Sequence, residues 1–387
     1  MNAVEAGIEI LDSISAISPR EWNQLAGDDP FISHEFLDAL HVTGCASADT
    51  GWAPCYLIMR EQGALTGAMP LYRKTHSYGE YVFDWAWADA YHRHGLHYYP
   101  KLLNAVPFTP VSGRRILAGT EGRRQSLLAA ALTLARDSDA SSLHCLFPSP
   151  DEAPDMEAAG LMTRRGVQFH WKNQEYADFE AFLATFNHAK RKKIRQERRR
   201  VRDAGIEFEW FRGADITDTL WAFFSRCYRE TYRLHQSTPY LNLDFFRTIG
   251  RAMPQNILLV VATRGQRPIA ASLNIHNGRR LCGRYWGALE YYPALHFETC
   301  FYQVIEFCIA NRIDSFEGGA QGKHKIARGL LPVNTRSMHW LAHPQFSAAI
   351  GDFLQREADD MSTHMDELGE HSPYKQVRAN EAHDIIT

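Results

Sequence analysis

The densest group of polar side chains lies in FEGGAQGKHKIARGLLP, residues 316–332. The segment IDSFEGG, residues 313–319, predicts a short strand at its start, and open α/β sheets place their sites just beyond the carboxyl ends of such strands. Glycine lets the backbone approach a ligand, and lysine and arginine add positive charge, which suits a phosphate or an oxyanion. The alternative is a solvated surface turn. The expected donor-binding residues here are Gly319, Gln321, Gly322, Lys323 and Arg328.

A second polar group interrupts an apolar strand, LCGRYWGAL, residues 281–289. Side chains alternate along a strand, so Arg284 and Trp286 are expected on one face, as substrate contacts, and Tyr285 on the other. An arginine inside an apolar strand needs a partner, because an unpaired buried charge is very costly. Glu317 on the next strand is the expected partner, in a pair that is either structural or catalytic.

Two titratable residues open the helix that follows this strand. The ordinary pKa of histidine suits proton transfer near neutrality, so His296 is a candidate catalytic group. A structural histidine is the alternative. Glu298 is a candidate substrate contact, or it offsets the positive end of the helix dipole.

The first half of the chain carries an aromatic stretch, residues 78–99, followed by VPFTPVSGRR, residues 106–115. The aromatic density fits either a pocket wall or the edge of a core. The spacing of His92, His94 and His97 matches neither H-E-x-x-H nor a zinc finger, so no metal is expected. The expected substrate contacts in this half are Tyr81, Trp85, Phe108 and Thr109.

The elements that must position these groups form two loosely similar halves. Residues 52–72 and 257–277 each predict a hairpin with a Gly-containing turn. After the second hairpin, Asn277-Gly278 predicts another tight turn and a third strand. A helix with apolar residues at helical spacing and a final short strand then imply a parallel crossover. This order is that of the acetyltransferase fold.

A basic segment separates the halves. Lys190–Arg202 holds nine basic residues and one acid, Glu197. It predicts a helix with Ile194 and Val201 as its apolar seam, which ends at Gly205. The cationic side is either a solvated face or a contact for a polyanion such as tRNA. Near the C-terminus, a packing helix is predicted with these residues on one face: Phe346, Ile350, Phe353, Leu354, Met361, Met365 and Leu368.

Composition sets the limits. A chain of 387 residues suggests two domains, expected at 1–170 and 171–345, with a helical tail at 346–387. The formal net charge of −3 is too small for the molecule as a whole to behave as a polyelectrolyte. The acidic N-terminus and the lack of a long apolar run predict a cytoplasmic protein. Seven scattered cysteines predict neither disulfides nor a cysteine zinc site. Motifs of P-loop ATPases, Rossmann dehydrogenases and α/β-hydrolases are absent.

Several segments resemble bacterial Fem-like proteins, described as peptidoglycan biosynthesis or recognition proteins of the GNAT acyltransferase superfamily. The resemblance runs nearly end to end and is carried above all by VPFTPVSGRRIL, KRKKIRQERR, GRYWGALEY and EGGAQGKHKIARGLLPV. It implies an α/β (α+β) fold of two tandem GNAT-like domains with mixed sheets. Fem enzymes move an amino acid from aminoacyl-tRNA onto a stem-peptide amine, and their Phe-Lys pair presents a lysine to the substrate. Lys325 is similar to that lysine, although His324 stands where the Phe would be.

The resulting hypothesis is an N-acyltransferase or aminoacyltransferase that acts on an amine, possible acceptors including a peptidoglycan-related peptide. Lys325 and Arg328 would stabilise the anionic centre or the donor phosphates, Glu317 or His296 would accept the ammonium proton, and Tyr285 would serve as acid. No tightly bound cofactor is expected, since the donor, acyl-CoA or aminoacyl-tRNA, is a co-substrate. One alternative is an acyl-CoA-dependent enzyme for a small molecule or peptide. Another is a non-catalytic protein that binds peptidoglycan fragments or nucleic acid.

Overall fold

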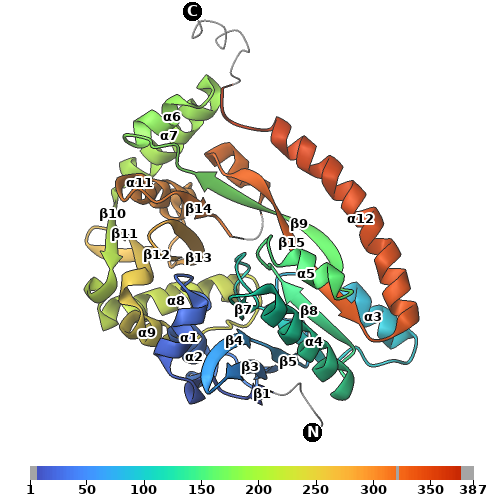
Figure 1. Cartoon of the computed structure of the whole chain (residues 1–387). Helices are drawn as coiled ribbons and strands as arrows, with labels where there is room; N and C mark the ends of the chain where they lie inside the picture. Colours follow the sequence, from blue (N-terminus) through green and yellow to red (C-terminus); the bar gives the residue numbers. More distant parts are fainter. Residues whose placement is uncertain (1–6, 320–321, 376–387) are drawn as a thin grey trace, which may run out of the picture.

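The computed structural model describes residues 7–319 and 322–375, in which helices surround two sheets (Figure 1). The small antiparallel sheet has the order β1-β3-β4-β7, and the large mixed sheet has the order β10-β11-β12-β13-β14-β9-β15-β8-β6-β5-β2. The small sheet contains β1 (Ile8–Leu11), β3 (Tyr56–Glu61), β4 (Ala64–Met69) and β7 (Leu117–Ala118). The large sheet contains β2 (Trp52–Pro54), β5 (Tyr72–Lys74), β6 (Lys101–Asn104), β8 (Ser142–Leu146), β9 (Met162–Lys172), β10 (Ile206–Arg212), β11 (Ile257–Arg264), β12 (Arg267–His276), β13 (Arg280–Ala288), β14 (Ser315–Glu317) and β15 (Leu331–Leu341).

Helices cover both sheets and connect their strands. The α-helices are α1 (Pro19–Ala26), α2 (His34–Val42), α3 (Trp85–Arg93), α4 (Glu121–Asp137), α5 (Ala153–Ala158), α6 (Phe179–Ala184), α7 (His188–Asp203), α8 (Asp218–Leu234), α9 (Leu243–Ala252), α10 (Leu295–Phe297), α11 (Gln303–Ala310) and α12 (Pro344–Glu370). The short helices are η1 (Ile14–Ala16), η2 (Gly213–Asp215), η3 (Pro254–Asn256), the π-helical η4 (Glu298–Tyr302) and η5 (Lys323–Arg328). No helix within the described ranges combines the length and apolarity needed to span a bilayer.

The second half follows the predicted order of elements. β11, β12 and β13 form an antiparallel meander, and the Asn277-Gly278 turn places Gly278 at φ +88°. Glycine accepts this left-handed conformation at little cost. A continuous helical segment, α10-η4-α11, then returns the chain to β14. β14 pairs in parallel with β13 over three residue pairs, from Arg280–Ser315 to Cys282–Glu317, which confirms the crossover.

The first half uses the same order, but its strands are bent or split. The predicted hairpin is confirmed, but it bends where β2 meets β3. The strand ends far from the turn, β2 and β5, therefore pair in the large sheet, and the part next to the turn, β3 and β4, belongs to the small sheet. The next strand is also divided, because β6 pairs with β5 and β7 pairs with β4. Residues 105–116 leave the sheet between them. β6 pairs in parallel with β8, as β13 pairs with β14.

The two halves exchange their last long strands. β9 follows β8 in the chain but pairs with β14 and β15, while β15 pairs with β8 and β9. Residues 170 and 171, between which the sequence suggested a domain boundary, both lie inside β9. We call β1–β8 with β15 the first module, and β10–β14 with β9 the second. α12 packs along β9 and β15 (Figure 1).

Side-chain alternation along β13 differs from the prediction. The pairing with β12 moves from Leu273–Tyr285 to Asn274–Gly283, so Arg284 has no residue opposite it. Such a β-bulge inserts one residue and shifts the following side chains to the other face. As a result, Tyr285 lies in the same apolar core as Cys282, although regular alternation would place two residues three positions apart on opposite faces.

Both predicted surface helices form. In α7, Ile194 and Val201 are buried, and the helix ends before Gly205 at φ +71°. In α12, Ile350, Leu354 and Leu368 are buried and confirm the packing face. Phe353 was predicted on the same face, but its side chain is 41% exposed and does not pack with the others. Residues 376–387 of the predicted tail lie outside the described residues.

Candidate active site

A cavity of about 200 Å³ opens where β13 and β14 separate beyond their parallel pairing. Its walls come from β12, β13, the crossover helix and the segment after β14. The strand pair separates because the bulge redirects β13 and because β14 ends at Glu317. Predicted site residues that line this cavity are Arg284, Tyr285, Trp286, His296 and Lys325, together with Ser272, Asn274, Gly283, Cys300, Phe301, Phe316, Gly318 and His324.

Lys325 lies in η5 and is only 4% exposed. Its Nζ donates a hydrogen bond to the carbonyl of Gly319 at 2.9 Å. Burial lowers the pKa of Lys325 to about 8, and the nearby Cys300 thiol partly opposes this shift. Gly318 packs closely beside it, since a Cβ at this position would lie 2.5 Å from Leu330 Cδ2 and 3.4 Å from Lys325 Cδ. Near neutral pH this ammonium can both stabilise an anion and release a proton.

Arg328, at the end of η5, is 3% exposed and does not line the cavity. Its Nη2 donates to both carboxylate oxygens of Glu197 on α7, at 3.0 and 2.9 Å. Its guanidinium also lies 3.3 Å from the ring centre of Phe297, and Tyr302 donates to the same carboxylate. Arg328 therefore ties the segment of Lys325 to α7 and to the crossover helix.

His296 and Glu298 begin the crossover helix but have different surroundings. His296 faces the cavity, its ring 4.8 Å from that of Trp286. Burial, with a smaller effect from the positive charges nearby, lowers the pKa of His296 to about 4. The imidazole is thus neutral at pH 7 and only weakly basic. Glu298 is buried, and its carboxylate accepts hydrogen bonds from Arg198 of α7 and Gln303, outside the cavity.

The expected Arg284–Glu317 pair does not form. Because of the bulge, Arg284 turns to the first module, and its Nη2 donates to the carbonyl of Phe108 at 2.6 Å. The Tyr285 hydroxyl donates to the same carbonyl at 3.2 Å. Glu317 instead pairs with Arg280 at 3.4 Å, on the side of β14 away from the cavity lining. Phe108 thus acts through its backbone, which positions two side chains of the cavity.

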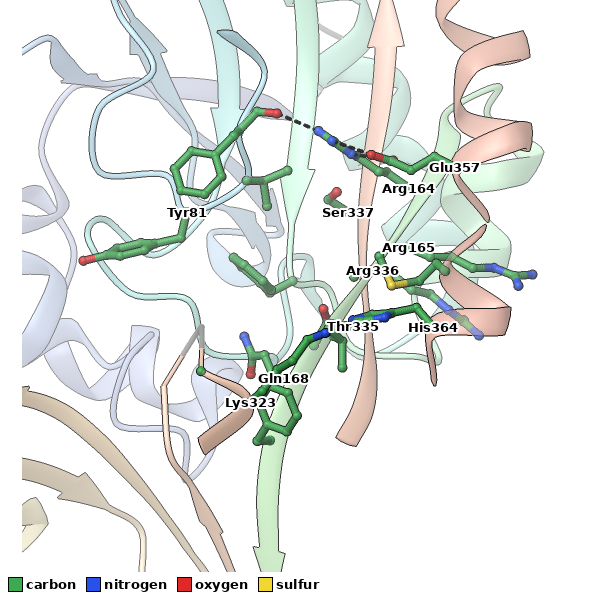
Figure 2. A pocket seen from close by; sticks show the side chains of 18 residues that line it. Tyr81, Arg164, Arg165, Gln168, Lys323, Thr335, Arg336, Ser337, Glu357 and His364 are labelled. Atoms are coloured by element: carbon green, nitrogen blue, oxygen red, sulfur yellow. Dashed lines mark hydrogen bonds and ion pairs between the residues drawn. The ribbon is translucent and has the colours of Figure 1, made fainter. Parts of the chain in front are cut away.

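The other predicted residues lie elsewhere. Thr109 is 3% exposed, and its hydroxyl donates to Pro107 O. Trp85 is 41% exposed, and its ring lies 4.9 Å from that of Tyr78. Gln321 falls outside the described residues. Tyr81, Gly322 and Lys323 line a second cavity of about 380 Å³ between the modules (Figure 2).

The sequence interpretation missed a buried charge cluster that shapes this region. Lys101 of β6 is fully buried, and its Nζ donates to Ser77 and Glu80, each at 2.8 Å, and to Asp84. Burial acts to lower the pKa of Lys101, but Glu80 and Asp84 outweigh it and the pKa is raised. The cluster fixes both ends of the loop that presents Tyr81, which has φ +62°. The available signal was a lysine directly before two leucines in a short predicted strand.

The comparisons with known proteins agree with this architecture. A family model named FemAB-like and described as peptidoglycan biosynthesis/recognition matches residues 13–376. The chain belongs to the FemAB-like family. No curated protein matches the sequence significantly.

Solved structures are similar to this FemAB-like chain in fold at low sequence identity. FemX has a TM-score of 0.54 at 10% identity, over 87% of this chain and 98% of that chain. L-PGS from Bacillus licheniformis has a TM-score of 0.51 at 10% identity, over 84% and 97%. A conserved protein of unknown function from Bacteroides thetaiotaomicron has a TM-score of 0.50 at 11% identity, over 86% and 99%. The fold class is the predicted α+β one: two modules with a similar order of strands are built on one mixed and one antiparallel sheet, and FemX is similar in fold.

Proposed function

We propose that this FemAB-like protein transfers an acyl or aminoacyl group from an activated donor to the amine of an acceptor, in the cavity of the second module. The observation that carries the proposal is Lys325, a buried lysine whose pKa is lowered to about 8, at the open end of a parallel strand pair. Membership of a peptidoglycan-related family favours a peptide of that class as acceptor.

The chemistry needs an oxyanion partner and a proton carrier. The neutral acceptor nitrogen attacks the donor carbonyl carbon, so a C–N bond forms and the C–O ester or C–S thioester bond breaks. The Lys325 ammonium stabilises the tetrahedral oxyanion and then gives its proton to the leaving oxygen or sulfur. The proton lost by the acceptor nitrogen restores the ammonium. Arg284 adds positive charge beside the cavity, and neutral His296 can accept a proton transiently.

Two features favour aminoacyl-tRNA over acyl-CoA as donor. The first is the exposed cationic surface of α7, where Lys192, Lys193 and Arg199 project to solvent and make no described ion pair. The second is the turn between β13 and the crossover helix, residues 289–294, which contains no glycine that could bring backbone amides close to a pyrophosphate. The buried carboxylate of Glu298 also occupies the first turn of η4, where it opposes an anion.

The test compares donors as salt is raised. Wild-type protein and Lys192→Gln/Arg195→Gln/Arg199→Gln protein are assayed with aminoacyl-tRNA and with an acyl-CoA thioester. Each phosphate contact contributes about 0.7–0.9 log units of affinity per decade of salt, so the triple variant should flatten the tRNA slope by about two to three units. The control removes three exposed arginines elsewhere, Arg20, Arg229 and Arg251.

Each outcome has a defined meaning. A raised KM for aminoacyl-tRNA, with unchanged kcat for the thioester, supports the tRNA donor. An unchanged salt dependence in the triple variant excludes α7 as the contact and moves the proposal to the acyl-CoA enzyme. Binding of a muropeptide without transfer from either donor would establish the non-catalytic alternative.

A further inference from the structure

Asn274 on β12 is a polar residue of the Lys325 cavity that the proposed chemistry leaves without a role. Its side chain is 1% exposed, and its Nδ2 group donates to oxygens on one side only. These are the carbonyl oxygens of Leu258 at 3.4 Å and Ser272 at 3.3 Å, and the Ser272 hydroxyl at 3.3 Å. The reverse orientation would set the amide oxygen against two carbonyls, so these contacts fix the direction of the amide.

Ser272 ties Asn274 to the crossover helix. The Ser272 hydroxyl donates to the carbonyl of Thr299 in η4 at 3.2 Å, which leaves its lone pairs to accept from Asn274. The same helical segment carries His296, another residue of the cavity. Asn274 is therefore held on the side of its nitrogen by β11, β12 and the crossover helix. A side chain that is locked by such supporting hydrogen bonds keeps its geometry before any ligand arrives.

The Oδ1 atom of Asn274 faces the cavity. Asn274 pairs with Gly283 of β13, which has no side chain, and a Cβ placed there would lie 3.5 Å from Oδ1. The same Cβ would lie 3.1 Å from Phe316 Cε2, so Gly283 keeps the space between Oδ1 and Phe316 open. Within the described ranges, no group donates a hydrogen bond to Oδ1. Because buried polar atoms generally have a partner, this oxygen is suited to an N–H group of a ligand.

Two cationic side chains share this cavity with Oδ1. The Lys325 ammonium and the Arg284 guanidinium can only donate hydrogen bonds, and the described lining contains neither aspartate nor glutamate. An amine has a single lone pair, and a hydrogen bond from either cation would occupy the electrons that must attack the carbonyl. Water has two lone pairs, so it can accept one such bond and still attack. A cavity of cations alone would therefore favour hydrolysis of the acyl donor over transfer to an amine.

We propose that Asn274 orients the acceptor amine: Oδ1 accepts one of its N–H groups, so that its lone pair points to the carbonyl carbon while Lys325 stabilises the oxyanion. This inference rests on the proposed transfer function, and it identifies a residue that favours an amine over water as nucleophile. The nitrogen becomes positively charged as the C–N bond forms, so its hydrogen bond to Oδ1 strengthens towards the transition state. The proton itself still passes to Lys325, because an amide oxygen is too weakly basic to take it up.

The experiment compares transfer with hydrolysis in the same protein. Acetyl-CoA and alanyl-tRNA serve as acyl donors, and the nucleophile is a muropeptide with a free amine or, for hydrolysis, water alone. Asn274→Leu removes the amide at nearly constant volume. Its kcat/KM for transfer should fall by about 10–100-fold, the scale of one hydrogen bond to a charged group, while hydrolysis stays within about twofold of wild type. Mass spectrometry of the two products measures the ratio of transfer to hydrolysis.

Asn104 on β6, in the first module, supplies the matched control. It is buried, its Nδ2 donates to the carbonyls of Pro70 and Arg115, and its Oδ1 has no described partner. Both leucine variants leave carbonyls without a donor and should lower the Tm, but Asn104→Leu should keep the wild-type ratio of transfer to hydrolysis. Gly283→Ala is a second variant that retains Asn274. Its methyl group narrows the space beside Oδ1, so transfer should fall more than hydrolysis.

The outcomes separate this inference from the transfer function. Equal losses of transfer and hydrolysis in Asn274→Leu would show that Asn274 holds the acyl donor or only the fold, and would overturn the inference while the transfer function stands. A changed ratio in Asn104→Leu would overturn it as well. Lys325→Met should lower both rates, because both reactions pass through an oxyanion. Wild-type protein that transfers to no amine from either donor would defeat the function, and the inference with it.

Discussion

The same strand arrangement ends in a closed site in one module and in an open site in the other. β6 and β8 are parallel over three residue pairs, and so are β13 and β14. Beyond the second pair lies the cavity of Lys325. Beyond the first pair the chain itself fills the space, because residues 105–116 leave the sheet there.

Polar groups inside the closed site satisfy each other. The buried Arg115 guanidinium donates to the carbonyls of Leu146 and Val111, and the Glu152 carboxylate accepts the backbone N–H groups of Arg115 and Ile116. The insertion that closes the first site also delivers Phe108 O to Arg284 and Tyr285, so one module supports the cavity of the other.

The comparison is tested most strongly by one substitution made in both modules. Lys325→Met should lower kcat by about 10²–10³-fold, the scale of losing one oxyanion contact, with an unchanged Tm. Lys74, in the first module, is also buried, and burial lowers its pKa to about 7. Lys74→Met is therefore the matched control, and its turnover per folded molecule should equal wild type. Steady-state kinetics with parallel thermal scans decides, and equal losses in the two variants would contradict the assignment.

The closed site should matter for stability and not for chemistry. Arg115→Met removes a buried charge that compensates Glu152 and leaves carbonyls without donors, so the free energy of unfolding should fall by about 3–5 kcal/mol. Urea unfolding measures this change. The kcat of the remaining folded protein should stay within about twofold of wild type, which is small beside the loss of about 10²–10³-fold expected when an oxyanion contact is removed. A selective loss of kcat at unchanged stability would show that the first module takes part in the reaction.

A smaller effect is expected where α7 meets the open site. Glu197→Gln weakens the anchor of Arg328 and should lower kcat by about tenfold through Lys325, the equivalent of one charged hydrogen bond. Glu180→Gln is the control, because Glu180 also pairs with an arginine of α7 but is exposed. Exposed pairs contribute about 0–1 kcal/mol, so this variant should behave as wild type. Indistinguishable kinetics for the two variants would remove the positioning role of Glu197.

The last prediction concerns pH. The ordinary pKa of lysine is 10.5, and burial places that of Lys325 at about 8. If the ammonium form is required, activity falls as pH rises through about 8, because the folded protein then loses this proton. This fall of activity at high pH, the alkaline limb of the profile, should be absent from the residual activity of Lys325→Met and retained in Lys74→Met. A kcat profile between pH 6 and 10 measures it, and a limb that survives in Lys325→Met would assign it to another group.

Local patterns predicted much of the second module. The turn at Asn277-Gly278, the seam of Ile194 and Val201, and the glycine-rich end of β14 before Lys325 are each encoded within a few residues. The family resemblance added the pairing of two such modules. The FemAB-like match confirms the family, and the parallel pairs β6–β8 and β13–β14 show the repeated arrangement.

Features that depend on distant segments were not predicted. The β13 bulge is set by pairing with β12 and by packing, so the expected partner of Arg284 was wrong. The burial of Glu197 depends on Arg328, which is 131 positions away. In the sequence, the acid looked like an exception within a basic surface, and it is instead the inner contact of that helix.

Strand exchange has a consequence for how the chain matures on the ribosome. His144 of β8 and His339 of β15 are opposite each other in the sheet, yet 195 positions separate them in the chain. At about 5–20 residues per second, β8 emerges roughly 10–40 seconds before its partner strand is synthesised. During that interval its edge offers unpaired backbone groups to any other strand nearby. The first module therefore completes its sheet only after nearly the whole chain has been synthesised.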